Sequence, residues 1–397
     1  MRIVYFADTQ IPSRATNGIQ VMRMCGAFAA AGVDVTLVHP YRFGNQPEGF
    51  EGDVWKFYGL EGTFRRVTLP TPLTLRLSAN RRLARALRLP PLAAYVSLRS
   101  RPGSSPFIAY GRSMLSLRLA DTARRVWRRG ACRAVVAELH DLPEGKAARD
   151  ALSRLDGVVT ISAELERDLV LLCPSLRGRI RVEHDGYDPM LIGPDQPSDR
   201  AKEVIGLRPD RPLIVYTGRV TTGKGARMLV EAAAKVPHAQ FLLVGKVYER
   251  DLLELGGRAG NVTFIGFVPP AAVGRYLAAA DVLVMPTHPS LPYARYSSPL
   301  KLFEYMAAGR PVVCSDLPAL REVVSDGRNA LLFPAGDVAS LVKAISRLVE
   351  DPALAMLIAD QAQRDVVRFA WDARAERIID WLASGIGREA ARQGRSL

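Results

Sequence analysis

The sequence of 397 residues predicts an α/β protein with two doubly wound parallel sheets. The length exceeds what one hydrophobic core usually supports, so two domains of about 150–200 residues are expected. Short apolar runs alternate with helical patterns in both halves, which is typical of parallel strands joined by crossover helices. Residues 186–199 contain three prolines and two glycines without hydrophobic periodicity, which indicates the linker between the domains.

Apolar runs in the first half predict strands at residues 3–7, 33–39, 134–138 and 158–161. An apolar-striped helix is expected over residues 18–31, where Gly32 ends it. Ser162 is placed to cap a helix over residues 163–172, because a serine side chain accepts a hydrogen bond from the first turn. The chain opens directly on a strand, so no signal peptide is expected before it.

Apolar runs in the second half predict strands at residues 213–217, 241–244, 262–266, 282–285 and 312–315. A closing helix with Trp371 and Trp381 is expected over residues 368–383. The expected division is therefore 1–187, 188–367 and a closing segment 368–397.

Composition excludes several classes of protein. No uninterrupted apolar run approaches the roughly 18 residues of a transmembrane helix. The four cysteines are widely scattered without a Cys-x-x-Cys pair, which favours buried thiols in a reducing compartment over zinc or disulfide sites. A cytoplasmic protein is expected.

Residues 297–313 begin with a predicted helix start. Ser298 suits the N-cap, Pro299 suits the first helical position, and Gly309 suits a left-handed residue at the helix end. The N–H groups of Leu300 and Lys301 would then lie at a helix N-terminus, a site that favours phosphate.

Side chains reinforce this interpretation. Lys301 adds a positive charge, and Glu304, one turn further on, is placed to accept hydrogen bonds from sugar hydroxyls. An ordinary capped helix of an α/β domain remains the alternative.

A second anion site is indicated after the strand at residues 213–217. The following glycine-rich turn, residues 218–225, carries Arg219 and Lys224 and leads into an apolar-striped helix. The spacing Gly-x-x-x-x-Gly-Lys resembles a P-loop, but Gly225 stands where a P-loop has Ser or Thr to hold Mg²⁺.

Three ordered motifs resemble the carboxy-terminal domain of the GT-B glycosyltransferases, specifically the large retaining family called family 4. The first motif is Gly218-Arg219 with Lys224-Gly225. The second is Gly266-Phe267-Val268-Pro269, and the third runs from Glu304 to Val313.

The resemblance covers nearly the whole chain and implies two Rossmann-like domains facing each other across a cleft. The first would bind the acceptor and the second a nucleotide sugar, UDP- or GDP-linked, and the last helix would return to the first domain. Arg219 and Lys224 would be catalytic, with retention of anomeric configuration and no cofactor. The implied nucleotide-sugar ligands are Gly18, Val268, Ser298, Pro299, Leu300, Lys301 and Glu304.

One departure concerns recognition of the donor sugar. Most of the family has two glutamates seven residues apart, and counting back from Glu304 leads to Ser297. The Ser-Pro-Leu-Lys-Leu-Phe-Glu version resembles a subgroup of the same family. A serine offers one hydroxyl where the family usually places a charged acceptor.

In the first half, His140 stands at the carboxyl end of a predicted strand, where ligands of open α/β sheets gather. It matches the family histidine beside the donor sugar and is expected to be catalytic. Glu138 and Arg112 match the subgroup's pattern on the acceptor side. Gly18 resembles the family's phosphate loop, with a simple turn glycine as the alternative, and a structural histidine is the alternative at His140.

Positive charge is concentrated between Arg65 and Arg133, which contains sixteen arginines, no lysine and one acid, Asp121. Arg81, Arg82, Arg85 and Arg88 fall on one face of a predicted amphipathic helix, which favours anionic lipid headgroups. The alternatives are a solvated basic face and nucleic-acid binding, although no nucleic-acid motif accompanies the arginines.

No Asp-x-Asp pair occurs in the chain to hold a metal ion on a diphosphate. Fixed cations and a helix N-terminus can stabilise the leaving group instead. The sequence thus predicts a metal-independent glycosyltransferase with a lipid-linked or saccharide acceptor, peripheral on the inner face of the membrane and acting in cell-surface polysaccharide or glycolipid synthesis. A P-loop-like ATPase and an arginine-rich nucleic-acid-binding protein are the rival hypotheses.

Overall fold

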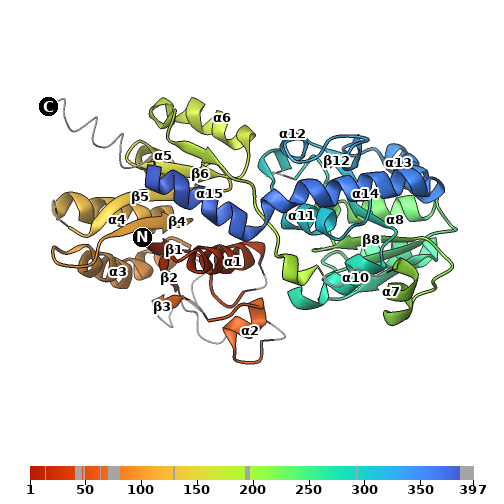
Figure 1. The fold of residues 1–397 in the computed structure, drawn as a ribbon, viewed down its shortest axis with the longest axis horizontal. Coiled ribbons are helices and arrows are strands. Elements are labelled where there is room, and N and C mark those ends of the chain that lie inside the picture. Colours follow the sequence, from red (N-terminus) through yellow and green to blue (C-terminus); the bar gives the residue numbers. More distant parts are fainter. Residues whose placement is uncertain are drawn as a thin grey trace. The chain divides into compact units, whose positions relative to one another are not determined.

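The computed structural model describes residues 1–384 except 14, 41–46, 48–49, 63, 70–80, 128–129, 193–196 and 292–293, and of 81–89 and 147 the backbone alone. The chain forms two compact units (Figure 1). Unit 1 is Met1–His184 together with the helix α15 (Trp371–Ser384), and unit 2 is Asp185–Ala370. The expected boundaries at 187/188 and 367/368 lie within three residues of these divisions. That the two units are separate functional domains remains a prediction.

Unit 1 contains a seven-stranded parallel sheet in the order β3-β2-β1-β4-β5-β6-β7. Its strands are β1 (Arg2–Phe6), β2 (Asp34–Pro40), β3 (Arg65–Leu69), β4 (Phe107–Gly111), β5 (Cys132–Leu139), β6 (Gly157–Thr160) and β7 (Ile180–Val182). The chain order reverses between β1 and β4, so ligands are expected outside the carboxyl ends of these two strands.

The helices of unit 1 are α1 (Thr16–Ala30), α2 (Val54–Tyr58), α3 (Arg81–Ser100), α4 (Met114–Val126), α5 (Lys146–Leu152), α6 (Ala163–Leu172) and α15. Ser162 caps α6 as predicted, since its hydroxyl accepts a hydrogen bond from Leu165 N. Helix α15 packs beside α1, so the end of the described chain belongs to the first unit (Figure 1).

Unit 2 contains a six-stranded parallel sheet in the order β10-β9-β8-β11-β12-β13. Its strands are β8 (Leu213–Thr217), β9 (Gln240–Val244), β10 (Val262–Ile265), β11 (Val282–Met285), β12 (Val312–Asp316) and β13 (Leu331–Pro334). Both faces of this sheet are buried: Leu213 and Val215 belong to one apolar cluster and Ile214 and Tyr216 to the other. The switch point lies between β8 and β11.

The helices of unit 2 are α7 (Ser198–Val204), α8 (Ala226–Ala233), α9 (Asp251–Ala259), α10 (Gly274–Ala279), α11 (Leu300–Ala307), α12 (Pro318–Arg321), α13 (Val338–Glu350) and α14 (Pro352–Val366). Gly309 follows α11 with a φ of 65°, the left-handed conformation predicted for it. The predicted fold class is confirmed: both units are doubly wound α/β folds.

Two further observations concern membrane-spanning helices and the cysteines. Within the part of the chain that the structure describes, no helix is both long and apolar enough to cross a bilayer. Cys25, Cys132 and Cys314 are buried and Cys173 is half-buried, and all four are free thiols.

Candidate active site

The glycine-rich turn after β8 lies at the switch point of unit 2, and two of its glycines are required by close contacts. A Cβ on Gly218, whose φ is 119°, would lie 2.7 Å from Nζ of Lys301. A Cβ on Gly225, whose φ is 83°, would lie 1.7 Å from the carbonyl oxygen of Pro286, which follows β11. The turn is therefore held tightly against the start of α11 and the end of β11.

Glu249 fixes the same turn from the side of β9. Its carboxylate accepts hydrogen bonds from the backbone N–H and the hydroxyl of Thr222, the first of them at 2.9 Å. Val220 forms a β-bridge with Val247. These contacts hold in place the segment that carries Arg219 and Lys224.

Lys301 projects from the first turn of α11 into this turn. Its Nζ donates a hydrogen bond to the carbonyl of Thr217 at 2.5 Å and lies 3.9 Å from the centroid of the Tyr216 ring. Burial lowers the pKa of Lys301 well below its ordinary value, and the positive charges of Lys224 and Arg219 lower it further. The positive charges of Arg219 and Lys224 thus act on the amine of Lys301.

Helix α11 starts differently from the prediction. Pro299 is the N-cap residue, and its side chain makes no capping hydrogen bond. Ser298, predicted as the N-cap, is buried, and its hydroxyl accepts a hydrogen bond from Asp185 N at 2.9 Å. The prediction was wrong because it considered only the local sequence, and a backbone N–H from 113 positions away occupies the hydroxyl.

Of the remaining predicted ligands of unit 2, Leu300 and Glu304 lie on α11. Leu300 is 8% exposed, so it offers its backbone N–H rather than its side chain. Glu304, half-buried, is close enough to Lys301 to raise the pKa of that amine, against the effect of burial. Val268 follows β10 and packs against the apolar core of unit 2. Tyr305 ties α11 to β8, because its hydroxyl accepts a hydrogen bond from Thr217 N at 2.7 Å.

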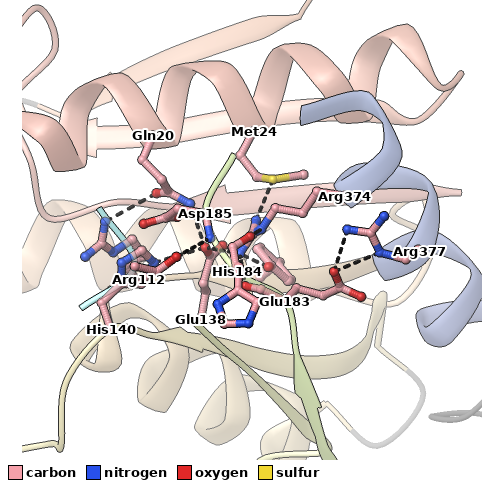
Figure 2. Close-up of polar contacts among 12 residues, drawn as sticks. Gln20, Met24, Arg112, Glu138, His140, Glu183, His184, Asp185, Arg374 and Arg377 are labelled. Atoms are coloured by element: carbon pink, nitrogen blue, oxygen red, sulfur yellow. Dashed lines mark hydrogen bonds and ion pairs between the residues drawn. The ribbon is translucent and has the colours of Figure 1, made fainter. Parts of the chain in front are cut away.

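Unit 1 contains a buried carboxylate at the end of β5, next to its own switch point. Glu138 is 1% exposed, and Figure 2 shows the polar side chains that surround it. Its Oε1 lies 2.6 Å from Gln20 Nε2, 2.9 Å from an Nη of Arg374 and 3.1 Å from His140 Nε2. Its Oε2 accepts hydrogen bonds from the hydroxyls of Tyr110 at 2.8 Å and Tyr5 at 3.2 Å.

Electrostatics decide the charge of this carboxyl. Burial alone would raise the pKa of Glu138, but Arg374 and the hydrogen bond with His140 lower it well below its ordinary value. Burial and the negative charge of Glu138 raise the pKa of Tyr5 and Tyr110, so both hydroxyls keep their hydrogens. Glu138, predicted on the acceptor side, is thus an ionised group in the interior of unit 1.

Two of the other predicted residues of unit 1, His140 and Arg112, belong to the same hydrogen-bonded group. The side chain of His140 is 14% exposed, so His140 extends from the buried carboxylate to the surface. Arg112, half-buried, donates a hydrogen bond to Gln20 Oε1 at 3.3 Å. Gly18 is in the first turn of α1, where a Cβ would lie 3.1 Å from Ser13 Cβ and 3.2 Å from the Tyr58 hydroxyl.

The predicted membrane residues cannot be placed in the same way. Arg81, Arg82, Arg85 and Arg88 are in α3 as predicted, and their side chains lie outside the described residues.

Five residues were not predicted as site residues: the partners of Glu138, which are Tyr5, Gln20, Tyr110 and Arg374, and Glu249 beside the glycine-rich turn. Tyr5 lies in a predicted strand, Tyr110 lies in a strand that was not predicted, and Arg374 lies in the predicted closing helix. Arg374 is in fact 0% exposed.

Comparison with known proteins finds similarity to glycosyltransferases. Residues 211–351 match the family model described as glycosyl transferases group 1. A D-inositol 3-phosphate glycosyltransferase of Xylanimonas cellulosilytica is 30% identical over 276 residues, which cover 63% of this chain and 62% of that protein. The chain spans between half and two thirds of the length of the curated relatives it matches.

Solved structures match over nearly the whole chain. The sucrose-phosphate synthase of Thermosynechococcus elongatus has a TM-score of 0.74 at 23% identity, covering 96% of this chain and 98% of that one. HepE of Anabaena, solved in complex with UDP-glucose, has a TM-score of 0.70 at 21% identity, covering 97% and 100%. The chain therefore has the GT-B glycosyltransferase fold, and over residues 211–351 it resembles the group 1 glycosyl transferases.

Proposed function

We propose that this protein is a glycosyltransferase that moves a sugar from a nucleotide-diphosphate sugar to an acceptor hydroxyl. The carrying observation is the cation cluster of Arg219, Lys224 and Lys301 at the switch point of unit 2. It adjoins the start of α11, where the N-cap residue Pro299 makes no side-chain capping hydrogen bond. Backbone N–H groups at a helix start, together with positively charged side chains, favour binding of a diphosphate. Several relatives and structural neighbours are glycosyltransferases, and HepE binds UDP-glucose.

The proposed reaction depends on stabilising negative charge. As the glycosidic bond to the diphosphate breaks, charge builds on the leaving phosphate, and Arg219, Lys224 and the N-terminus of α11 stabilise it in place of a metal ion. Glu304 accepts hydrogen bonds from the ribose hydroxyls. We propose that His140 acts on the donor sugar, as the family histidine that it matches does. We propose retention of configuration, in keeping with the family that the motifs resemble.

Alanine substitutions test the phosphate site. Arg219→Ala and Lys224→Ala should each lower turnover about 10²–10³-fold, the range for loss of one preorganised donor. Arg219→Lys should recover only part of it, because an ammonium lacks the bidentate fork. The matched control is Lys343→Ala, which removes an exposed lysine from α13. Near-normal activity of both alanine variants would remove the two residues from the site.

A donor screen establishes the substrate class. A panel of UDP- and GDP-sugars is tested by thermal shift, since a ligand of the folded state raises the melting temperature. Release of UDP or GDP is then measured in EDTA and in Mg²⁺. Equal rates support metal independence, whereas activity only with Mg²⁺ contradicts it.

The same assay distinguishes a glycosyltransferase from the rival ATPase, because an ATPase should hydrolyse ATP in the presence of Mg²⁺. The structure argues against that rival at Gly225. A P-loop places the hydroxyl of Ser or Thr at this position, and here a side chain would overlap the carbonyl of Pro286.

We further propose a lipid-linked acceptor at an anionic membrane surface, in cell-surface polysaccharide or glycolipid synthesis. Helix α3 carries the four predicted arginines and packs against α4, which bears the exposed Arg118 and Arg125. Apolar side chains are exposed on the same two helices: Leu98 is 53% and Val126 68% exposed. Cations beside exposed apolar groups favour an interfacial location.

Vesicle binding tests the surface. Exchanging Arg81, Arg82, Arg85 and Arg88 for glutamate should abolish binding to vesicles that contain phosphatidylglycerol and leave binding of UDP or GDP unchanged. Wild-type binding should fall steeply with added salt. A protein that ignores such vesicles at low salt has a soluble acceptor instead.

A further inference from the structure

We propose that Arg374, on the last helix of the chain, is a positioning residue for His140 and acts through Glu138. The proposal rests on the proposed function in one respect, the catalytic role of His140. The contacts involved all lie within unit 1 (Figure 2).

The first step is the shared oxygen. Arg374 and His140 both contact Oε1 of Glu138, at 2.9 and 3.1 Å. An ionised carboxylate only accepts hydrogen bonds, so His140 must carry a hydrogen on Nε2 to make this contact. The carboxylate thereby selects one tautomer of the imidazole and fixes the orientation of the ring.

The second step is the immobility of the guanidinium. Arg374 Nε donates to the carbonyl of His184 at 2.8 Å, and an Nη donates to the carbonyl of Glu183 at 3.3 Å. Its other Nη lies 2.7 Å from Sδ of Met24. These contacts fix the position of the Arg374 guanidinium, and the guanidinium in turn fixes the position of the Glu138 carboxylate that it pairs with.

The third step is energetic. Arg374 and Glu138 are both 0% exposed in their side chains. Removing two charges from water is costly, and a buried ion pair is often no more stabilising than apolar residues of the same volume. A contribution to stability is therefore a weak explanation for the buried pair. Orienting His140 is a better one, because an ionised Glu138 is needed to fix the hydrogen on Nε2.

The decisive variant is Arg374→Gln. With the positive charge removed, the Glu138 carboxylate loses the strongest of the charges that favour its ionised form, and its hydrogen bond with His140 weakens. We expect kcat to fall about 10- to 100-fold, by analogy with loss of the outer-shell partner that orients a metal-bound histidine. KM for the sugar nucleotide should stay within about twofold, and the pH profile of kcat should shift.

A matched control lies one turn along the same helix. Arg377 pairs with Glu183 at 2.9 Å and is 34% exposed, and it does not contact Glu138 in the described network. Arg377→Gln should leave kcat, its pH profile and the state of His140 unchanged.

A spectroscopic measurement reports on His140 without requiring activity. In protein labelled with ¹⁵N-histidine, the His140 signals, assigned by comparison with His140→Gln, distinguish the two neutral tautomers. Wild type and Arg377→Gln should show the Nε2–H form at pH 8, and Arg374→Gln should show a mixture with the Nδ1–H form.

A second variant covers the case in which Arg374→Gln does not fold. Glu138→Gln with Arg374→Met removes both charges together, which a folded interior tolerates better than one unpaired charge. The double variant should fold, lose the selected tautomer and lose kcat as above. Wild-type kcat and an unchanged tautomer in either folded variant overturn the proposal. If wild type releases no nucleoside diphosphate from any donor, the proposed function fails, while the tautomer measurement still decides whether Arg374 acts on His140.

Discussion

Replacing Lys301 with methionine tests the phosphate site through a residue that the fold itself constrains. The variant keeps an unbranched side chain and removes the ammonium group. It loses the hydrogen bond to the Thr217 carbonyl and the contact with the Tyr216 ring. Together these contribute about 1–3 kcal/mol. Because repulsion from Arg219 and Lys224 is lost as well, the net loss of unfolding free energy should be smaller, and the melting temperature should fall by less than about 6 °C.

The effect on diphosphate binding should be larger. A hydrogen bond to a charged group contributes about 1.5–3 kcal/mol, which corresponds to a loss of about 10- to 150-fold in affinity for UDP or GDP. Isothermal titration calorimetry measures it directly. Lys343→Met, on an exposed part of α13, is the control and should bind like wild type.

The pH dependence distinguishes a direct contact from a general loss of charge. Burial, and then Lys224 and Arg219, lower the pKa of Lys301 in the free protein. A bound diphosphate raises it again, so above the pKa of the free protein binding takes up a proton. Wild-type affinity should therefore fall as pH rises, by at most tenfold per pH unit for this one group. Lys301→Met should lose that part of the slope. Equal affinity and equal slope in both proteins would refute the assignment of Lys301 to the phosphate site.

Three further predictions concern single residues. Gly225→Ala should lower the free energy of unfolding by at least about 2 kcal/mol, because φ is 83° and the new Cβ would overlap the Pro286 carbonyl. The control Gly257→Ala lies in open space on α9 and should raise the free energy of unfolding by about 0.5–1 kcal/mol. Similar urea midpoints for the two variants would contradict this account. Glu304→Gln should weaken binding of UDP or GDP by about 1–3 kcal/mol in calorimetry, and unchanged binding would place the ribose elsewhere. Burial lowers the pKa of His39 from 6.5 to about 4, so the unfolded chain binds a proton that the folded protein excludes, and about 2 kcal/mol of unfolding free energy should be lost between pH 7 and 4.5. His39→Gln should lack this loss in urea titrations, and a parallel loss in the variant would assign the acid sensitivity to other groups.

Local patterns were sufficient for most elements of the fold. The strands Leu213–Thr217 and Val282–Met285 and the helix Ala163–Leu172 have the predicted bounds, because their apolar runs and the Ser162 cap are encoded within a few residues. The strands β3 and β7 were not predicted. Both are at sheet edges, where an arginine in the strand is tolerated because one side faces solvent. Strand β4, Phe107–Gly111, was also missed, although its short apolar run could have been found within the arginine-rich segment.

The residues of the candidate site also fall into those that local patterns predict and those that they do not. Arg219, Lys224 and Lys301 were predicted from turn and helix-start motifs, and the fold brings them together. The environment of Glu138 could not be predicted, because its partners come from β1, α1, β4 and α15, and no local pattern pairs them. Ser298 was assigned the wrong partner for the same reason.

The pairing of Glu138 with Arg374 also has a consequence for the order in which the protein is synthesised. The two residues are 236 positions apart, and all of unit 2 is translated between them. At about 5–20 residues per second, the carboxylate leaves the ribosome roughly ten to fifty seconds before its cation. During that interval the core of unit 1 contains an acid without its counter-charge. The first unit to be translated is therefore the last to be completed, and a nascent chain stalled inside unit 2 should expose the surface of α1 that α15 covers to proteases and chaperones.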